Sequence, residues 1–181
     1  HEDGGIDITE TYVLNFTEAK HGFFRNIPTS YDMEWSVDGK AGKKSYYFPV
    51  SEVTCNRTCS LEGNADAVVV KLGDPDKTVY GEQKYEISYH VKTKDLDLSN
   101  HAQALYWNLA SGFDTQIRHL SYDIKMPKAF DENAVFTYSG AFGETTTNLT
   151  HEVDQLHIKG ETGRLLLSNE SATIKVNLPN G

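Results

Sequence analysis

The sequence predicts an all-β protein: an antiparallel β-sandwich, immunoglobulin-like or related, with about ten short strands. Apolar residues recur at every second position in several segments, and Gly, Pro, Asn and Asp separate these segments. No window carries a long period of 3.6 residues, which argues against a helical protein. The hydrophobic content of 38% is sufficient to fill a core between two sheets.

The clearest strand is predicted over residues 6–17. One row contains Ile6, Ile8, Tyr12 and Leu14, whereas polar residues dominate the other row. The same alternation predicts strands over residues 82–93, 118–127 and 172–179. Weaker candidates are 45–53, 67–73, 104–109, 134–140, 155–159 and 164–168. Over residues 100–110 a helical turn competes with a strand.

A length of 181 residues suits a single sandwich domain over residues 1–181. The one candidate subdivision lies near residues 127–133, where proline and polar residues interrupt two strands. We therefore expect one domain, with this segment as the place where it would divide.

The charge and the motifs of the chain exclude several classes of function. A formal net charge of −9 would repel a nucleic acid over most of the surface. No apolar run is long enough for a membrane-spanning helix. The histidines are scattered, without the close spacing of metal ligands, and no Gly-x-Ser-x-Gly motif is present. We expect no catalytic residues, no metal and no cofactor, and hence a protein that is not an enzyme.

The two cysteines, Cys55 and Cys59, enclose only three residues. They form either a local disulfide in a secreted protein or two thiols in a reduced one, because so small a ring restricts the geometry of the bond. A zinc site would need two further ligands in a similar local cluster, and the sequence offers none.

Glu10 lies in the apolar row of the first strand, between Ile8 and Tyr12. A carboxylate that faces a core needs a cation, since its desolvation alone costs several kcal/mol. Arg25 follows in an equally apolar setting, and its planar guanidinium suits a carboxylate. Our hypothesis is a structural ion pair between Glu10 and Arg25. The alternative, in which Arg25 awaits an anionic ligand, is less favoured.

Three aromatic residues, Tyr106, Trp107 and Phe113, lie close together in the chain. If they were exposed they would form a platform on which sugar rings stack. The competing interpretation, a tryptophan in the core of a sandwich, is preferred because such rings bury large areas.

Five motifs occur in a fixed order: "DITETYVLNF", "HGFFRNIP", "VKLGDPDKTVYGEQKYEISYHV", "ALYWNLASGFDTQIRHLSYDIKMP" and "ATIKVNLPNG". In this order and spacing they resemble the extracytoplasmic N-terminal domain of an uncharacterised bacterial membrane-protein family, the domain of unknown function 2207. The resemblance covers nearly the whole chain.

The resemblance implies a signal peptide upstream, a β-rich domain outside the cytoplasmic membrane, and a transmembrane helix soon after "LPNG". Glu10 and Arg25 fall on motif positions to which the family assigns no activity. The cysteine pair is not part of the family pattern, and a strand expected before "EDGG" is missing from this sequence.

The function expected from these observations is a binding or assembly module at the bacterial cell surface. Its partner would be an unknown protein or a cell-wall component. It would be tethered to the membrane through a segment outside this chain and would lie on the extracytoplasmic side. The alternative is a carbohydrate-binding or cell-wall-binding module, and a hydrolase is the more remote one.

Overall fold

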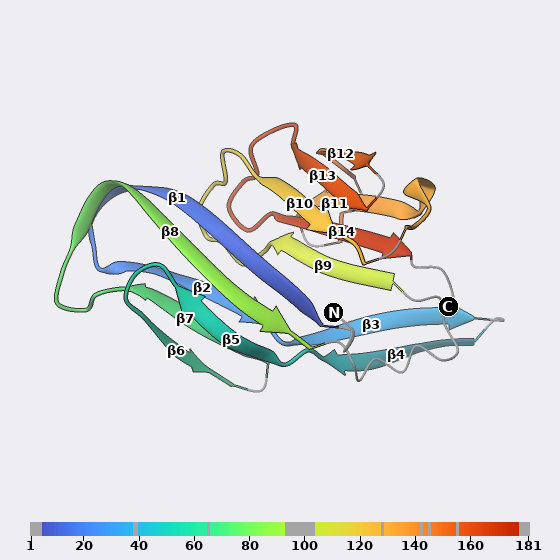
Figure 1. The fold of residues 1–181 in the computed structure, drawn as a ribbon, viewed down its shortest axis with the longest axis horizontal. Helices are drawn as coiled ribbons and strands as arrows, with labels where there is room; N and C mark the ends of the chain where they lie inside the picture. The colour runs from blue at the N-terminus through green and yellow to red at the C-terminus, as the bar shows by residue number, and fades with distance from the viewer. Residues whose placement is uncertain are drawn as a thin grey trace. The chain divides into compact units, whose positions relative to one another are not determined.

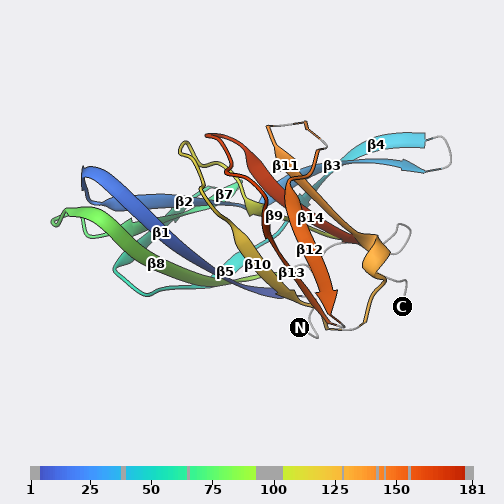
Figure 2. The same ribbon diagram turned by 90° about the horizontal axis from the view of Figure 1, so that it is seen from above.

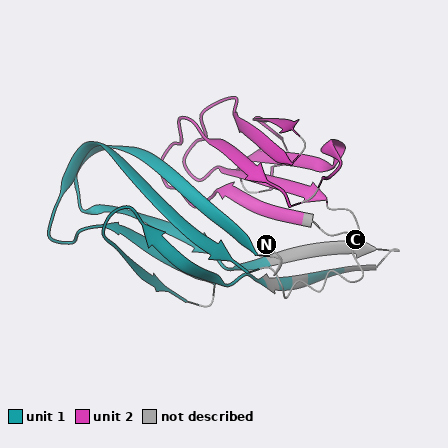
Figure 3. Ribbon diagram, in the orientation of Figure 1, with its two compact units in different colours: residues 1–97 teal, residues 98–181 magenta. Residues whose placement is uncertain are grey.

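A computed structural model describes residues 5–37, 40–64, 66–92, 104–127, 129–141, 143–144, 146–154 and 156–177. The chain forms two compact units, residues 1–97 and 98–181 (Figure 3). The segment 127–133, where the sequence suggested a subdivision, lies inside the second unit. The described residues are almost entirely β-structure, with fourteen strands against the expected ten or so, and a single 3-10 turn, η1 (Glu132–Ala134).

The first unit contains two three-stranded antiparallel sheets and one hairpin (Figure 1). One sheet has the order β1-β8-β5, and the other has the order β2-β7-β6. The strands of the first sheet are β1 (Ile6–Lys20), β8 (Val79–Val91) and β5 (Val50–Cys55). Those of the second are β2 (Gly22–Pro28), β7 (Ala67–Gly73) and β6 (Cys59–Gly63). The hairpin pairs β3 (Ser30–Val37) with β4 (Lys40–Tyr47).

The long strands β1 and β8 run side by side in both views (Figures 1 and 2). Their register is continuous from Ile6 to Phe16, so each inward residue of β1 lies beside an inward residue of β8. Tyr85 and Ile87 of β8 are buried, and the ring of Tyr85 lies 5.1 Å from that of Phe23 on β2. The two sheets therefore face each other across an apolar layer, as the period of two predicts.

The second unit repeats this plan with two further antiparallel sheets, of orders β10-β13-β12 and β11-β14-β9. The first comprises β10 (Ser121–Lys125), β13 (His157–Thr162) and β12 (Leu149–Asp154). The second comprises β11 (Val135–Gly140), β14 (Ser171–Asn177) and β9 (Ala104–Ala110).

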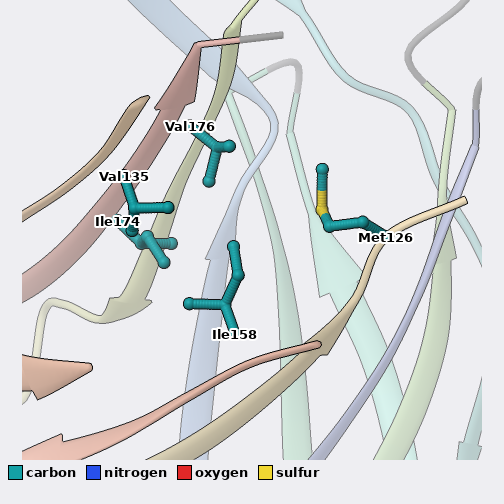
Figure 4. Packing of buried hydrophobic residues seen from close by; sticks show 5 residues of the cluster. All are labelled: Met126, Val135, Ile158, Ile174 and Val176. Atoms are coloured by element: carbon teal, nitrogen blue, oxygen red, sulfur yellow. The ribbon is translucent and has the colours of Figure 1, made fainter. Parts of the chain in front are cut away.

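The core of the second unit lies between its two sheets (Figure 4). Ile158 of β13 contributes from one sheet, and Ile174 and Val176 of β14 contribute from the other; all three are fully buried. Met126 and Val135 complete this cluster. Alternating apolar residues on both sheets thus account for the second sandwich.

The predicted strand over residues 164–168 is wrong. Only Leu166 pairs there, through an isolated bridge to Ile117. Three consecutive leucines provide no alternation, and the segment turns back at Asn169, whose φ is +64°. An ion pair between Arg164 and Glu170 closes this turn with an Nη1–Oε2 distance of 2.6 Å.

Candidate functional site

A buried polar cluster lies between the two sheets of the first unit. Arg25 of β2 is only 2% exposed, and it donates two hydrogen bonds to Glu10 of β1. Its Nε lies 2.8 Å from Oε2, and its Nη2 lies 2.8 Å from Oε1. The structure thus brings the two predicted residues together in a bidentate ion pair that links the two sheets.

Two tyrosines that the sequence analysis did not single out complete the cluster. The Tyr89 hydroxyl donates to Oε1 of Glu10 at 2.8 Å, and the Tyr12 hydroxyl donates to Oε2. Each carboxylate oxygen of Glu10 therefore accepts two hydrogen bonds. A carboxylate has about four acceptor positions, so all of them are occupied. Arg25 also donates from Nη1 to the carbonyl of Asn26.

The electrostatics of the cluster follow from burial and charge. Burial by itself would raise the pKa of Glu10, but the hydrogen bonds and the charge of Arg25 outweigh it and hold that pKa below its usual value of 4.5. Burial, together with the charge of Glu10, raises the pKa of Tyr12 and that of Tyr89 far above their ordinary value. Glu10 is thus a charged group with its acceptors filled, which is the state of a structural residue rather than of a general base.

The register of the strands explains why these residues meet. Glu10 pairs with Ile87, so its side chain points inward with the apolar residues of β1 and β8. Arg25 pairs with buried Val70 and takes an inward position on β2. The two tyrosines share the inward rows, since Tyr12 pairs with Tyr85 and Tyr89 with Ile8. A tyrosine two positions from a buried acid was the available sequence signal.

Cys55 and Cys59 are joined by a disulfide bond in the structure. Cys55 ends β5 and pairs with Ile87, whereas Cys59 begins β6 and pairs with Leu72. The bond therefore links an edge strand of one sheet to an edge strand of the other. It lies at the edge of the sandwich opposite β1 and β2, according to the order of the strands in both sheets.

The structure does not bring Tyr106, Trp107 and Phe113 together on one face. Tyr106 is 38% exposed, while Trp107, its neighbour in β9, points to the opposite face and packs on the core of the second unit. Phe113 packs against a second cluster, formed by Ala110, Leu149, Leu166 and Ala172.

Tyr106 instead shares the outer face of its sheet with Phe136. Lys175 of β14 pairs with Phe136 of β11 on one side and with Tyr106 of β9 on the other. Phe136 is 40% exposed, and Nζ of Lys175 lies 6.0 Å from the centre of its ring. In the next row, the Thr173 hydroxyl donates to Oδ1 of Asn108 at 2.8 Å. Sequence reasoning missed this row because its members come from three separate strands.

The fold and these two inter-sheet links define an all-β protein of two sandwich units. In the first unit, an ion pair joins the two sheets at one edge and a disulfide joins them at the other. A family model described as the N-terminal domain of predicted membrane proteins, DUF2207, matches residues 1–165. The chain belongs to this family, as its motifs had suggested.

No curated protein and no solved structure matches the chain. Within the described ranges, no helix is both long and apolar enough to cross a membrane. The same residues contain no group of three or more His, Cys, Asp or Glu side chains arranged to hold a metal ion.

Proposed function

We propose that the chain is the extracytoplasmic domain of a membrane-anchored protein and serves there in binding or assembly. The observation that carries the proposal is the Cys55–Cys59 disulfide. Such bonds form and persist in oxidising compartments and are rare in a reducing cytosol. Membership of a family of predicted membrane proteins supports the anchorage.

A binding role is favoured over catalysis by the state of the buried cluster. Glu10 receives four hydrogen bonds, and both of its oxygens are held by Arg25. A catalytic acid or base needs a free position toward a substrate, and this carboxylate offers none. The partner would be a protein or a cell-wall component, and a nucleic acid is disfavoured by the net charge of −9.

The location can be tested by thiol labelling in intact cells. In the full-length protein carrying Cys55→Ser, the thiol left within residues 1–181 is Cys59, which is partly exposed, and peptide mapping distinguishes it from any label elsewhere. A membrane-impermeant maleimide should label this thiol in intact cells, and the wild-type domain should become labelled only after reduction. Labelling of the Cys55→Ser variant only after lysis would place the domain in the cytoplasm and contradict the proposal.

A second candidate function is a carbohydrate-binding or cell-wall-binding module. The row Phe136–Lys175–Tyr106 favours it, because two partly exposed rings flank an ammonium group across three adjacent strands. Strand spacing sets the outer strands roughly 10 Å apart. Aromatic rings can stack on the faces of sugars, and the ammonium group can meet an anionic or hydroxyl substituent.

This candidate predicts retention of the purified chain on isolated peptidoglycan or cell-wall polysaccharide. The double variant Tyr106→Ala/Phe136→Ala should lose most of the retention. Tyr80→Ala is the matched control, since Tyr80 is 68% exposed in the other unit. Equal retention of both variants, or no retention of the wild type, would remove the candidate.

A further inference from the structure

We infer that the free edge of β1 is a dimerisation surface, on which β1 of a second copy of this chain adds as an antiparallel strand. β1 is the longest strand of the described chain, with fifteen residues, and it pairs there with β8 alone. This inference concerns the first unit by itself and does not depend on the compartment proposed above.

Backbone hydrogen bonding shows which residues of β1 are directed to the free edge. The N–H of Glu86 in β8 donates to Oδ1 of Asn56, the residue that follows β5. The carbonyl of Glu86 accepts from the N–H of the same asparagine. Successive residues of a strand direct these groups to opposite sides, so Ile87 directs its own toward β1. Its partner there, Glu10, is therefore bonded to β8.

By the same alternation, the backbone groups of Thr9, Thr11 and Val13 are directed away from β8. They make no hydrogen bond to backbone on that side in the part of the chain that the structure describes. Their side chains lie on the outer face and are exposed, Val13 to 62%. A row of unpaired N–H and carbonyl groups on a regular strand is a template for another strand.

The other edges of the two three-stranded sheets carry features that discourage such addition. β5 has six residues and a bulge where Glu52 has a φ of +56°. β6 has only five residues, and β2 ends in Pro28. β1 has neither proline nor a basic residue between Ile6 and Ala19, and its register has no bulge before Phe16. Proteins usually protect long edges with such devices or with an inward-pointing charge. Before Phe16, β1 carries only the last of these, Glu10, whose charge is paired with Arg25 inside the sandwich, so this edge stays open to a second strand.

A second copy fits the edge without a clash of charges. With a two-fold axis at Thr11, the threonine of one copy faces the Thr11 of the other, and Thr9 faces Val13. These are pairs of β-branched residues, which suit adjacent strands. The result is a continuous six-stranded sheet of order β5-β8-β1-β1-β8-β5. Thr9, Thr11 and Val13 include no acidic side chain that would attract a partner with a basic strand. We therefore propose a second copy of this chain as the occupant of the edge.

The test uses the purified 181-residue chain in sedimentation velocity over a range of concentrations. We expect a reversible dimer. Thr11→Lys and Thr11→Glu should each weaken association about tenfold or more, because like charges then face each other at the axis. An equimolar mixture of these two variants should restore the dimer. Thr54→Lys, an exposed threonine of β5 in the same sheet, should leave association unchanged.

Covalent trapping provides a second readout that does not depend on affinity. Directly opposed residues of adjacent antiparallel strands have Cα atoms roughly 4.5–5.5 Å apart, which is within the range of a disulfide. Thr11→Cys should therefore form an oxidised dimer, whereas Thr54→Cys should not. A chain that is monomeric at every concentration, or a dimer that Thr11→Lys and Thr11→Glu leave intact, would overturn the inference.

Discussion

Glu10 and Arg25 join the two sheets of the first unit at the edge opposite the Cys55–Cys59 disulfide. In each sheet a middle strand, β8 or β7, separates these two links. The ion pair and the disulfide thus hold the same two layers by different chemistry. Their separate contributions to stability can be measured.

Arg25→Ala should lower the free energy of unfolding of the first unit by about 3–5 kcal/mol, because it leaves the buried Glu10 carboxylate without its cation. Urea denaturation followed by tryptophan fluorescence and circular dichroism measures this loss. Arg118→Ala is the control, since Arg118 is exposed and its removal should change stability by less than about 0.5 kcal/mol. Unchanged stability of Arg25→Ala would revive the idea of an anion-binding arginine.

Stability should fall in acid because of Glu10. Its pKa is lower in the folded chain than its usual value of 4.5, so the folded state binds fewer protons at this group than the unfolded state. Its contribution is complete above about pH 4.5 and is lost as the pH falls through the folded pKa. Urea midpoints measured from pH 7 down to pH 3 should show this loss in the wild type.

The variant Glu10→Gln isolates that effect. It should be less stable than the wild type at pH 7, and the difference between the two should shrink steadily below pH 4.5. A difference that stays constant down to pH 3 would mean that the carboxylate does not titrate differently in the two states.

Replacing both cysteines with alanine should cost about 2 kcal/mol, the loop-closure value for a ring of five residues. The ion pair lies roughly 10 Å away across a three-stranded sheet, so its loss and that of the disulfide should add within about 0.5 kcal/mol. Denaturation of Arg25→Ala, Cys55→Ala/Cys59→Ala and the combined variant tests this. A combined loss well below the sum would show that the two links depend on each other.

The sequence was sufficient to predict the alternating strands, because these follow from a period of two. It was also sufficient to predict the Glu10–Arg25 contact, because a charge on the inward row is costly to bury without a partner. The same period separates Tyr106 from Trp107, since neighbours in a strand point to opposite faces. This rule is a reason against the joint platform, the less favoured interpretation, and agrees with the preferred one, in which the tryptophan packs in the core.

Other features depend on information that local sequence does not contain. Phe136 meets Lys175 and Tyr106 only because β14 lies between β11 and β9, an order that joins segments far apart in the chain. The oxidation of Cys55 and Cys59 was likewise undetermined from the sequence. It depends on β5 ending, and β6 beginning, at the same edge of two opposed sheets.

Gly160 of β13 provides the last prediction, because Tyr122 of β10 lies over it. The two residues are paired across adjacent strands, and the Tyr122 hydroxyl donates a hydrogen bond to the carbonyl of Thr150 on β12 at 3.0 Å. Burial in this position raises the pKa of Tyr122 to about 12. A Cβ atom at Gly160 would lie 2.1 Å from the Thr150 carbonyl oxygen and 2.5 Å from Cζ of Tyr122.

Gly160→Ala should therefore destabilise the second unit by about 1–3 kcal/mol, since the ring and a backbone carbonyl would both have to shift. It should also lower the pKa of Tyr122, measured by ultraviolet titration, because the displaced ring becomes more exposed. Gly163→Ala is the matched control: its added Cβ would meet only the Asn148 carbonyl, at 3.3 Å. If the two variants unfolded at the same temperature, the packing of Tyr122 on Gly160 would contribute nothing measurable to stability.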